Sequence, residues 1–244
     1  MKTVKNRNSR SHTDIAIKLS GVSKRYTIHH EKPTLVEHLI KGKTEEFWAL
    51  KDINLEIKKG EKVGFYGPNG SGKTTLLKII AGISSPTLGS VEIQGKIVSL
   101  IDLEAGFHPD LMGVENIYLN GMLLGMSKND INNKLASIIS FSGLGQFIDT
   151  PLFTYSTGMK LRLGFSVAIF ADPEILILDE SFGVGDRNFR NKTGNKLNEL
   201  FRKRKTIIIV TQWIEFLKKN CQKILLLDHG MLSTMSNNMI SKLI

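Results

Sequence analysis

The chain has 244 residues, of which 41% are hydrophobic, and this is enough apolar material for one large domain with a full core. No apolar run approaches the roughly 18 residues that a membrane span requires, so we expect a soluble or peripheral protein. The formal net charge of +10 has three possible explanations: binding to a nucleic acid, contact with a membrane surface, or origin in a lysine-rich proteome. Because the basic residues are scattered, we expect no nucleic acid partner. The lone Cys221 excludes an internal disulfide and fits a reducing compartment.

The first quarter of the chain combines a polar tail with an expected edge sheet. Residues 1–14 are basic and polar without an apolar core, which predicts a loose tail and argues against a signal peptide. Apolar and polar residues alternate in residues 15–19 and 48–57, which predicts two strands. Between them, residues 33–42 predict a short amphipathic helix that ends at a glycine.

The next segment carries a phosphate-binding pattern in the required context. Residues 63–66 indicate a buried strand, and residues 75–81 indicate a helix that ends at Gly82. Between them lies the pattern G-x-x-x-x-G-K-[ST], whose glycines let backbone N–H groups turn toward phosphate at a helix N-terminus. We therefore predict a nucleoside triphosphate site. The expected nucleotide contacts are Gly67, Pro68, Asn69, Gly70, Ser71, Gly72, Lys73, Thr74 and Thr75.

Within this site, two side chains have distinct expected roles. Lys73 should reach the β and γ phosphates, and the hydroxyl of Thr74 should ligate Mg²⁺. The guanine-specific sequence Asn-Lys-x-Asp is absent, which favours adenine and hence ATP. Tyr26 is the candidate surface on which the base would stack, although an exposed tyrosine beside a basic strand end is also common.

The middle of the chain, residues 105–165, is helical in pattern. Ser127 and Asp130 have the spacing of a capping box, so we expect a helix to begin there. Residues 155–160 read Tyr-Ser-Thr-Gly-Met-Lys and lead into an apolar helix. A helix that begins here would provide a second N-terminus, besides the one after the phosphate loop, that could bind an anion.

A buried strand that ends in two acids follows. Residues 175–178, which follow Glu174, are apolar, as in a parallel strand whose carboxyl end opens on a nucleotide. Asp179 would then hold Mg²⁺, and Glu180 would position or deprotonate the attacking water. A solvated acidic turn is the alternative, but the phosphate loop upstream favours catalysis. Residues 206–211 and 223–227 are expected to complete the parallel sheet.

Together, these motifs resemble those of ATP-binding cassette proteins. Residues 155–160 are similar to the signature motif of that family, in which the serine and glycine, here Ser156 and Gly158, clasp the γ phosphate held by a second subunit. The form Tyr-Ser-Thr-Gly-Met narrows the resemblance to the ATPase subunits of polysaccharide, O-antigen and teichoic-acid exporters. The segments that share this narrower resemblance are residues 105–111, 115–121 and 183–186.

The resemblance implies an α/β fold: a P-loop NTPase of the ABC ATPase type, with a parallel-sheet core, an antiparallel β subdomain and an inserted α-helical lobe. It places the ATP-binding core at residues 15–104 and 166–244, and the signature lobe, which grips the transporter, at residues 105–165. It further implies a homodimer that sandwiches ATP, an integral membrane permease as partner, and a peripheral place on the cytoplasmic face of the cell membrane. The cargo would be a lipid-linked polysaccharide or a teichoic-acid-like polymer.

Three positions leave alternatives open. Gln212 stands where the family usually carries a switch histidine, and its amide can donate one N–H toward the γ phosphate but cannot become cationic. The protein is therefore expected to be either a slow ATPase or a nucleotide-gated structural subunit whose hydrolysis is vestigial. Glu104 stands where the exporters often have glycine, and it would offer a carboxylate to the site or be an ordinary strand-end acid. In the exporters the helix at residues 33–42 lies near the membrane, while an ordinary surface helix is the other interpretation.

Overall fold

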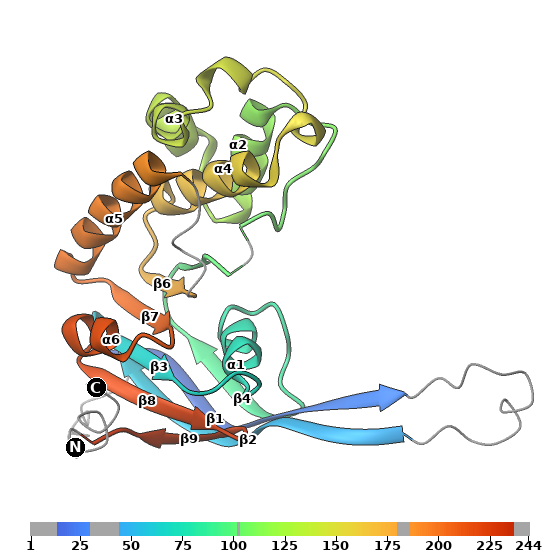
Figure 1. Ribbon diagram of the computed structural model, residues 1–244, viewed down its shortest axis with the longest axis vertical. Coiled ribbons are helices and arrows are strands. Elements are labelled where there is room, and N and C mark those ends of the chain that lie inside the picture. The colour runs from blue at the N-terminus through green and yellow to red at the C-terminus, as the bar shows by residue number, and fades with distance from the viewer. Residues whose placement is uncertain (1–13, 30–43, 102, 180–185, 237–244) are drawn as a thin grey trace, which may run out of the picture.

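The computed structural model describes residues 14–29, 44–101, 103–179 and 186–236, which Figure 1 shows as coloured ribbons. The expected helix at residues 33–42 and the catalytic candidate Glu180 lie outside the described residues, as does nearly all of the predicted tail. Over the described ranges, no helix has the length and apolar character needed to span a membrane.

Two β-sheets form the base of the molecule. The first is antiparallel, with the order β2-β1-β4, and contains β1 (Ile15–His29), β2 (Thr44–Lys58) and β4 (Leu88–Ile93). The second has the order β5-β6-β7-β3-β8-β9. Its strands are β5 (Ile97–Ser99), β6 (Ile175–Leu178), β7 (Thr206–Val210), β3 (Lys62–Tyr66), β8 (Lys223–Asp228) and β9 (Met231–Thr234). All neighbours pair in parallel except β8 and β9, which are antiparallel.

Strands β6 and β7 are almost entirely apolar because both faces of the second sheet are covered. In β6, Ile175 and Ile177 pack into one core, whereas Leu176 and Leu178 pack into the other. Every residue of β6 and β7 is buried. The unbroken apolar runs in the sequence follow from this burial, since a strand with one solvent face would alternate.

Helix α1 (Lys73–Ile80) fills the layer between the two sheets. Its buried residues Leu76, Leu77, Ile79 and Ile80 share a core with side chains of both sheets. Figure 1 shows α1 between β4 and β3, directly above the antiparallel sheet. The helix begins at Lys73, two residues before the expected start. It ends where Gly82 adopts a left-handed φ of 73°, so the predicted glycine stop is confirmed.

The remaining helices share the other hydrophobic core, on the side of the second sheet opposite α1. They are α2 (Gly113–Leu123), α3 (Lys128–Ser142), α4 (Thr157–Phe170), α5 (Arg187–Arg202) and α6 (Ile214–Asn220), with two 3-10 turns, η2 (Gly145–Phe147) and η3 (Leu152–Thr154). Figure 1 shows α2, α3 and α4 grouped at the end of the molecule farthest from the antiparallel sheet. The capping box is confirmed, because Ser127 Oγ accepts from the backbone N–H of Asp130 at 3.1 Å.

The structure confirms the predicted α/β fold with its parallel core, antiparallel sheet and helical region. It adds β4, β5 and β9, which the sequence did not reveal. In the segment expected to be helical, residues 105–112 form no helix, and α4 continues to Phe170, past the expected lobe boundary at residue 165.

Candidate functional site

The phosphate loop joins β3 to α1 and passes close to two other backbone segments. A Cβ at Gly67 would lie 2.1 Å from the carbonyl oxygen of Leu227, and one at Gly72 would lie 2.5 Å from that of Ala49. Gly72 also has a φ of 105°, which L side chains rarely adopt. Both glycines are therefore required by the path of the loop, independently of any ligand.

Lys73 lies over this loop. Its Nζ donates to the carbonyl oxygen of Gly67 at 2.8 Å and to that of Pro68 at 2.7 Å. The first backbone bond of α1 runs from the N–H of Leu76 to the carbonyl of Gly72, at 2.9 Å. The N–H groups of Thr74 and Thr75 precede that bond, and such first-turn groups have no acceptor within their own helix. A cation and a positive helix end thus lie at the same place.

The Ser71 hydroxyl is a buried polar group in the loop that a bound phosphate could satisfy. Ser71 is 4% exposed, and in the described part of the chain its Oγ is one of two buried side-chain polar atoms without a hydrogen-bond partner. The carbonyl of the same residue accepts from the N–H of Gly230 at 3.1 Å, which fixes the backbone there. A buried hydroxyl without a partner is costly, and an anion in the loop would satisfy it.

Asp179 follows β6 at the same edge of the sheet as the phosphate loop. Leu178 pairs with Ile209, and Val210 pairs with Phe65, so the carboxyl ends of β6, β7 and β3 are level. Asp179 is half-buried there. The structure brings this acid and the loop to one edge, as the sequence predicted.

Gln212 is joined directly to the loop. Its Nε2 donates to Oδ1 of Asn69 at 2.6 Å, although the two residues are 143 positions apart in the chain. Since β7 lies next to β3, the segments that follow these strands leave the sheet side by side.

The two signature candidates lie elsewhere in the chain. Ser156 caps α4, and its Oγ accepts from the N–H of Met159 at 3.2 Å. Ser156 is exposed and Gly158 is half-buried, and the nearest atom to a Cβ built at Gly158 is Ser156 Oγ, 3.9 Å away. The preceding Tyr155 is buried, which raises the pKa of its hydroxyl, and that hydroxyl donates to the carbonyl of Phe147 at 2.6 Å. The end of α4 is therefore firmly anchored but open to solvent.

Tyr26 lies on β1, directly opposite Phe47 of β2, and is 42% exposed. The Lys24 ammonium group is 5.4 Å from the centre of its ring, so the ring already faces one cation. Its role toward adenine stays a prediction. Glu104 is half-buried, and its carbonyl accepts from the N–H of Phe107 at 3.0 Å.

Two residues whose structural roles the sequence did not reveal hold the helical region in place. Arg162 of α4 donates from Nε to the carbonyl of Ser142 at 2.8 Å and from a terminal nitrogen to Asp186 Oδ2 at 3.3 Å. Asp186 caps α5, and the hydrogen bond from the N–H of Phe189, with smaller contributions from Asn188 and Arg162, lowers the pKa of its carboxyl.

Asn116 is the second such residue. It is fully buried in α2, and its Nδ2 donates to the carbonyls of His108, Leu111 and Met112. Its Oδ1 accepts from the N–H of His108 at 2.8 Å. These bonds tie residues 108–112 to the start of α2. No local pattern identifies either residue, because the partners are backbone groups and, for Arg162, an acid 24 positions away.

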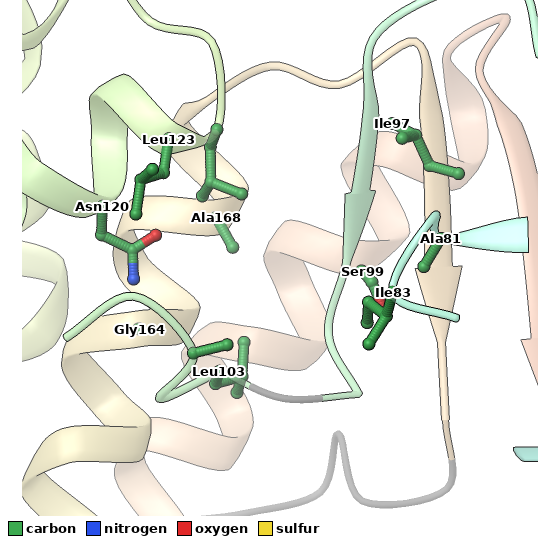
Figure 2. Close-up of a pocket in the computed structure, with 11 residues that line it drawn as sticks. Ala81, Ile83, Ile97, Ser99, Leu103, Asn120, Leu123, Gly164 and Ala168 are labelled. Atoms are coloured by element: carbon green, nitrogen blue, oxygen red, sulfur yellow. The ribbon is translucent and has the colours of Figure 1, made fainter. Parts of the chain in front are cut away.

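A cleft of about 300 Å³ separates the core from the helical region. Figure 2 shows Ala81, Ile83, Ile97 and Ser99 on one wall and Asn120, Leu123, Gly164 and Ala168 on the other, with Leu103 beside Gly164. Ile83 is 56% exposed and Leu123 is 65% exposed. This apolar cleft lies beside Glu104, whose two neighbours Leu103 and Ala105 line it.

The family model described as "ABC transporter" matches residues 50–183 of the chain. The chain is 49% identical to the O-antigen export system ATP-binding protein RfbB of Myxococcus xanthus over 182 residues, which are 75% of the chain. Over 223 residues it is 38% identical to the protein of the same name from Klebsiella pneumoniae, and over 220 residues it is 40% identical to the teichoic acids export ATP-binding protein TagH of Listeria innocua. These alignments cover 42%, 90% and 65% of the respective relatives, so the chain spans less than two thirds of the first and third.

Solved structures give the same picture of the fold. The chain is similar, with a TM-score of 0.68 and 25% identity, to an ATP-binding cassette solved as a dimer in a post-hydrolysis state with ADP and Pi bound. The alignment covers 91% of this chain and 99% of that one. The ATP-binding subunit of an ABC transporter superimposes with a TM-score of 0.69 at 20% identity, over 90% of each chain.

Proposed function

Because the chain belongs to the ABC transporter family of ATP-binding proteins, we propose that it binds and hydrolyses ATP to drive an exporter of a lipid-linked polysaccharide or teichoic-acid-like polymer. The observation that carries this proposal is the convergence of three elements at one sheet edge: the loop with Lys73, the acid Asp179, and the amide of Gln212. The cargo is proposed from the O-antigen and teichoic-acid export proteins to which the chain is similar.

The residues around the loop have the chemistry that ATP requires. Lys73 and the start of α1 would face the β and γ phosphates, and the hydroxyl of Ser71 would gain its missing partner. Tyr26 would stack on the adenine. Thr74 and Asp179 would hold Mg²⁺, which when bound neutralises charge on the phosphates. Glu180 directly follows Asp179 in sequence, and we propose that it positions or deprotonates the attacking water.

The working unit that we propose is a homodimer. Ser156 and Gly158 belong to α4, on the opposite face of the second sheet from α1, so they are poorly placed to serve their own phosphate loop. The exposed N-terminus of α4 is suited to face a γ phosphate held by a second copy. The related cassette crystallised with ADP and Pi is a dimer, which supports this arrangement.

An integral membrane permease is the second proposed partner, with this chain peripheral on the cytoplasmic face of the cell membrane. We propose residues 105–165 as the lobe that carries the signature and residues 15–104 and 166–244 as the ATP-binding core. The cleft between core and helices would receive an apolar segment of the permease, since Ile83 and Leu123 leave large apolar surfaces uncovered at its mouth. Glu104, between two cleft-lining residues, would then lie close to the bound segment of the permease.

A nucleotide-gated structural subunit with vestigial hydrolysis is the second candidate, because an amide at position 212 cannot relay a proton. Reconstitution of the chain with its permease in lipid vesicles separates the two. We expect ATP hydrolysis that rises when a lipid-linked polysaccharide or teichoic acid is added, and that requires Mg²⁺. Normal ATP binding without turnover in the complete assembly would favour the structural subunit. Turnover stimulated by a different cargo would contradict the proposed substrate.

A further inference from the structure

The hydrogen bond between Gln212 and Asn69 joins the phosphate loop to the segment that follows β7. Gln212 Nε2 and Asn69 Oδ1 are 2.6 Å apart, and both residues are exposed. Their side chains meet at the surface where the triphosphate would lie, so this bond acts on groups that ATP can reach.

The backbone is fixed on both sides of this contact. Thr211 is 8% exposed, and its Oγ1 accepts from the N–H of Trp213 at 3.1 Å, which sets the turn that carries Gln212. On the other side, the N–H of Ser71 donates to the carbonyl of Pro68 at 3.3 Å, and Lys73 Nζ holds the same carbonyl. Asn69 therefore extends from a held loop toward a held turn.

A primary amide can serve three partners at once. It carries two N–H donors and an oxygen with two acceptor sites, and the bond to Asn69 uses one N–H. The second N–H and Oε1 remain, and these are the donor and acceptor that a γ-phosphate oxygen and an attacking water require. A glutamine side chain that is free to rotate would present them in many orientations, whereas one fixed at its Nε2 keeps few.

We infer that Asn69 is a positioning residue that orients the amide of Gln212 for ATP hydrolysis. This inference rests on the proposed function and adds a role to Asn69 beyond its place in the phosphate loop. Asn69 acts through Gln212, so its contribution belongs to turnover and depends on the presence of that glutamine.

The test is a double-mutant cycle on the chain assembled with its permease, with ATP and Mg²⁺ as substrate. We expect Asn69→Ala to lower kcat about tenfold or more while the KM for ATP changes less than about twofold, because only the orientation of Gln212 is lost. Gln212→Ala should lower kcat by about 10²-fold or more. In the Gln212→Ala background, Asn69→Ala should cause no further loss. Asn198→Ala, which changes an exposed asparagine of α5, is the matched control and should keep native kinetics.

Three results would overturn the inference. They are an equal loss of kcat from Asn69→Ala in both backgrounds, a rise in the KM for ATP with kcat unchanged, and native kinetics in the single variant. The first two would mean that Asn69 acts on the nucleotide directly. A native assembly that does not hydrolyse ATP at all would instead overturn the proposed function, and the inference with it.

Discussion

At the scale of single residues, we propose that Lys73 is the cation on which the nucleotide site depends. Its ammonium group already lies 2.7–2.8 Å from two carbonyl oxygens of the loop that would wrap the phosphates. We expect Lys73→Ala to abolish hydrolysis and to weaken ATP binding, because the variant loses the charge at the β and γ phosphates and the two bonds that shape the loop. Hydrolysis measured beside binding of a fluorescent ATP analogue checks both effects.

Lys78→Ala is the matched control, since Lys78 is an exposed lysine in the last turn of the same helix. It should hydrolyse ATP at the native rate. Native turnover in the Lys73 variant would contradict the assignment of the nucleotide site.

The second residue-scale prediction concerns histidine at position 212. A neutral imidazole has one N–H, and a histidine that donates it to Asn69 has none left for the phosphate. We therefore expect Gln212→His to lower kcat by about 10²-fold at pH 8. A protonated imidazole has two N–H groups, so the deficit should shrink as the pH falls through about 6.5. The ratio of variant to native kcat between pH 6 and 8 measures this.

The native protein is the control for pH, because glutamine does not titrate between pH 6 and 8. The other titratable groups of the enzyme affect the kcat of both proteins alike. A variant that is faster than the native protein at pH 8 would show that Asn69 does not occupy the ring N–H.

Sequence alone predicted the residues of the phosphate loop, since their spacing carries the chemistry within eight positions. It also placed Asp179 and residue 212 at strand ends. It could not predict the bond between Gln212 and Asn69 or the bonds of Arg162, because each joins atoms brought together only when distant strands and helices pack. The buried Asn116 was recognised as part of a family motif, but its four hydrogen bonds to backbone groups were not.

At the scale of elements, the strands that the sequence predicts are the buried ones. Strands β6 and β7 were predicted because both of their faces are covered and all of their residues except Thr206 are apolar. Strand β4 contains a glycine and is largely exposed, β5 has only three residues, and β9 is exposed at the sheet edge. Such strands are held by backbone bonds to a neighbour, which leave little trace in the side-chain pattern.

Helix α2 carries the element-scale prediction, which concerns the apolar cleft. Leu123 is 65% exposed at the cleft, whereas its neighbour Met122 is 52% exposed and is not part of the cleft lining. We expect Leu123→Asp to abolish co-purification with the permease, because a carboxylate would have to be buried against an apolar segment. Met122→Asp should retain it. Equal loss in both variants, at an unchanged unfolding midpoint, would place the permease contact elsewhere on the helices.

At the scale of the whole molecule, the layers separate two groups that we propose meet around one ATP. Helix α1 lies between the sheets, and α4 lies on the far side of the second sheet. We propose that a chain with its phosphate loop and its signature on opposite faces completes its site with another copy, which would contribute its own α4. Two such copies facing each other complete both sites, as expected of a symmetric dimer.

Glu180→Gln tests this arrangement, because it removes the proposed base and leaves Asp179 in place. ATP should then be bound and not consumed, and the bound nucleotide should hold two chains together by mass action. Molar mass measured by light scattering, with and without ATP, should double only when ATP is present. Glu174→Gln is the matched control, since Glu174 precedes the same strand and accepts from the N–H of Lys96, which glutamine can also do. It should remain an active enzyme that does not accumulate as a dimer.

A second substitution identifies the surface through which the trapped chains meet. A Cβ at Gly158 would lie in open space except for Ser156 Oγ at 3.9 Å, so Gly158→Asp should fold normally. Its carboxylate would face the γ phosphate of the other copy and repel it. The double variant Glu180→Gln, Gly158→Asp should therefore bind ATP but stay monomeric. If it dimerises as well as Glu180→Gln, the chains meet through a surface other than the start of α4. If Glu180→Gln itself stays monomeric in saturating ATP, both alone and beside the permease, then either Glu180 is not the base or the signature residues do not clasp the nucleotide.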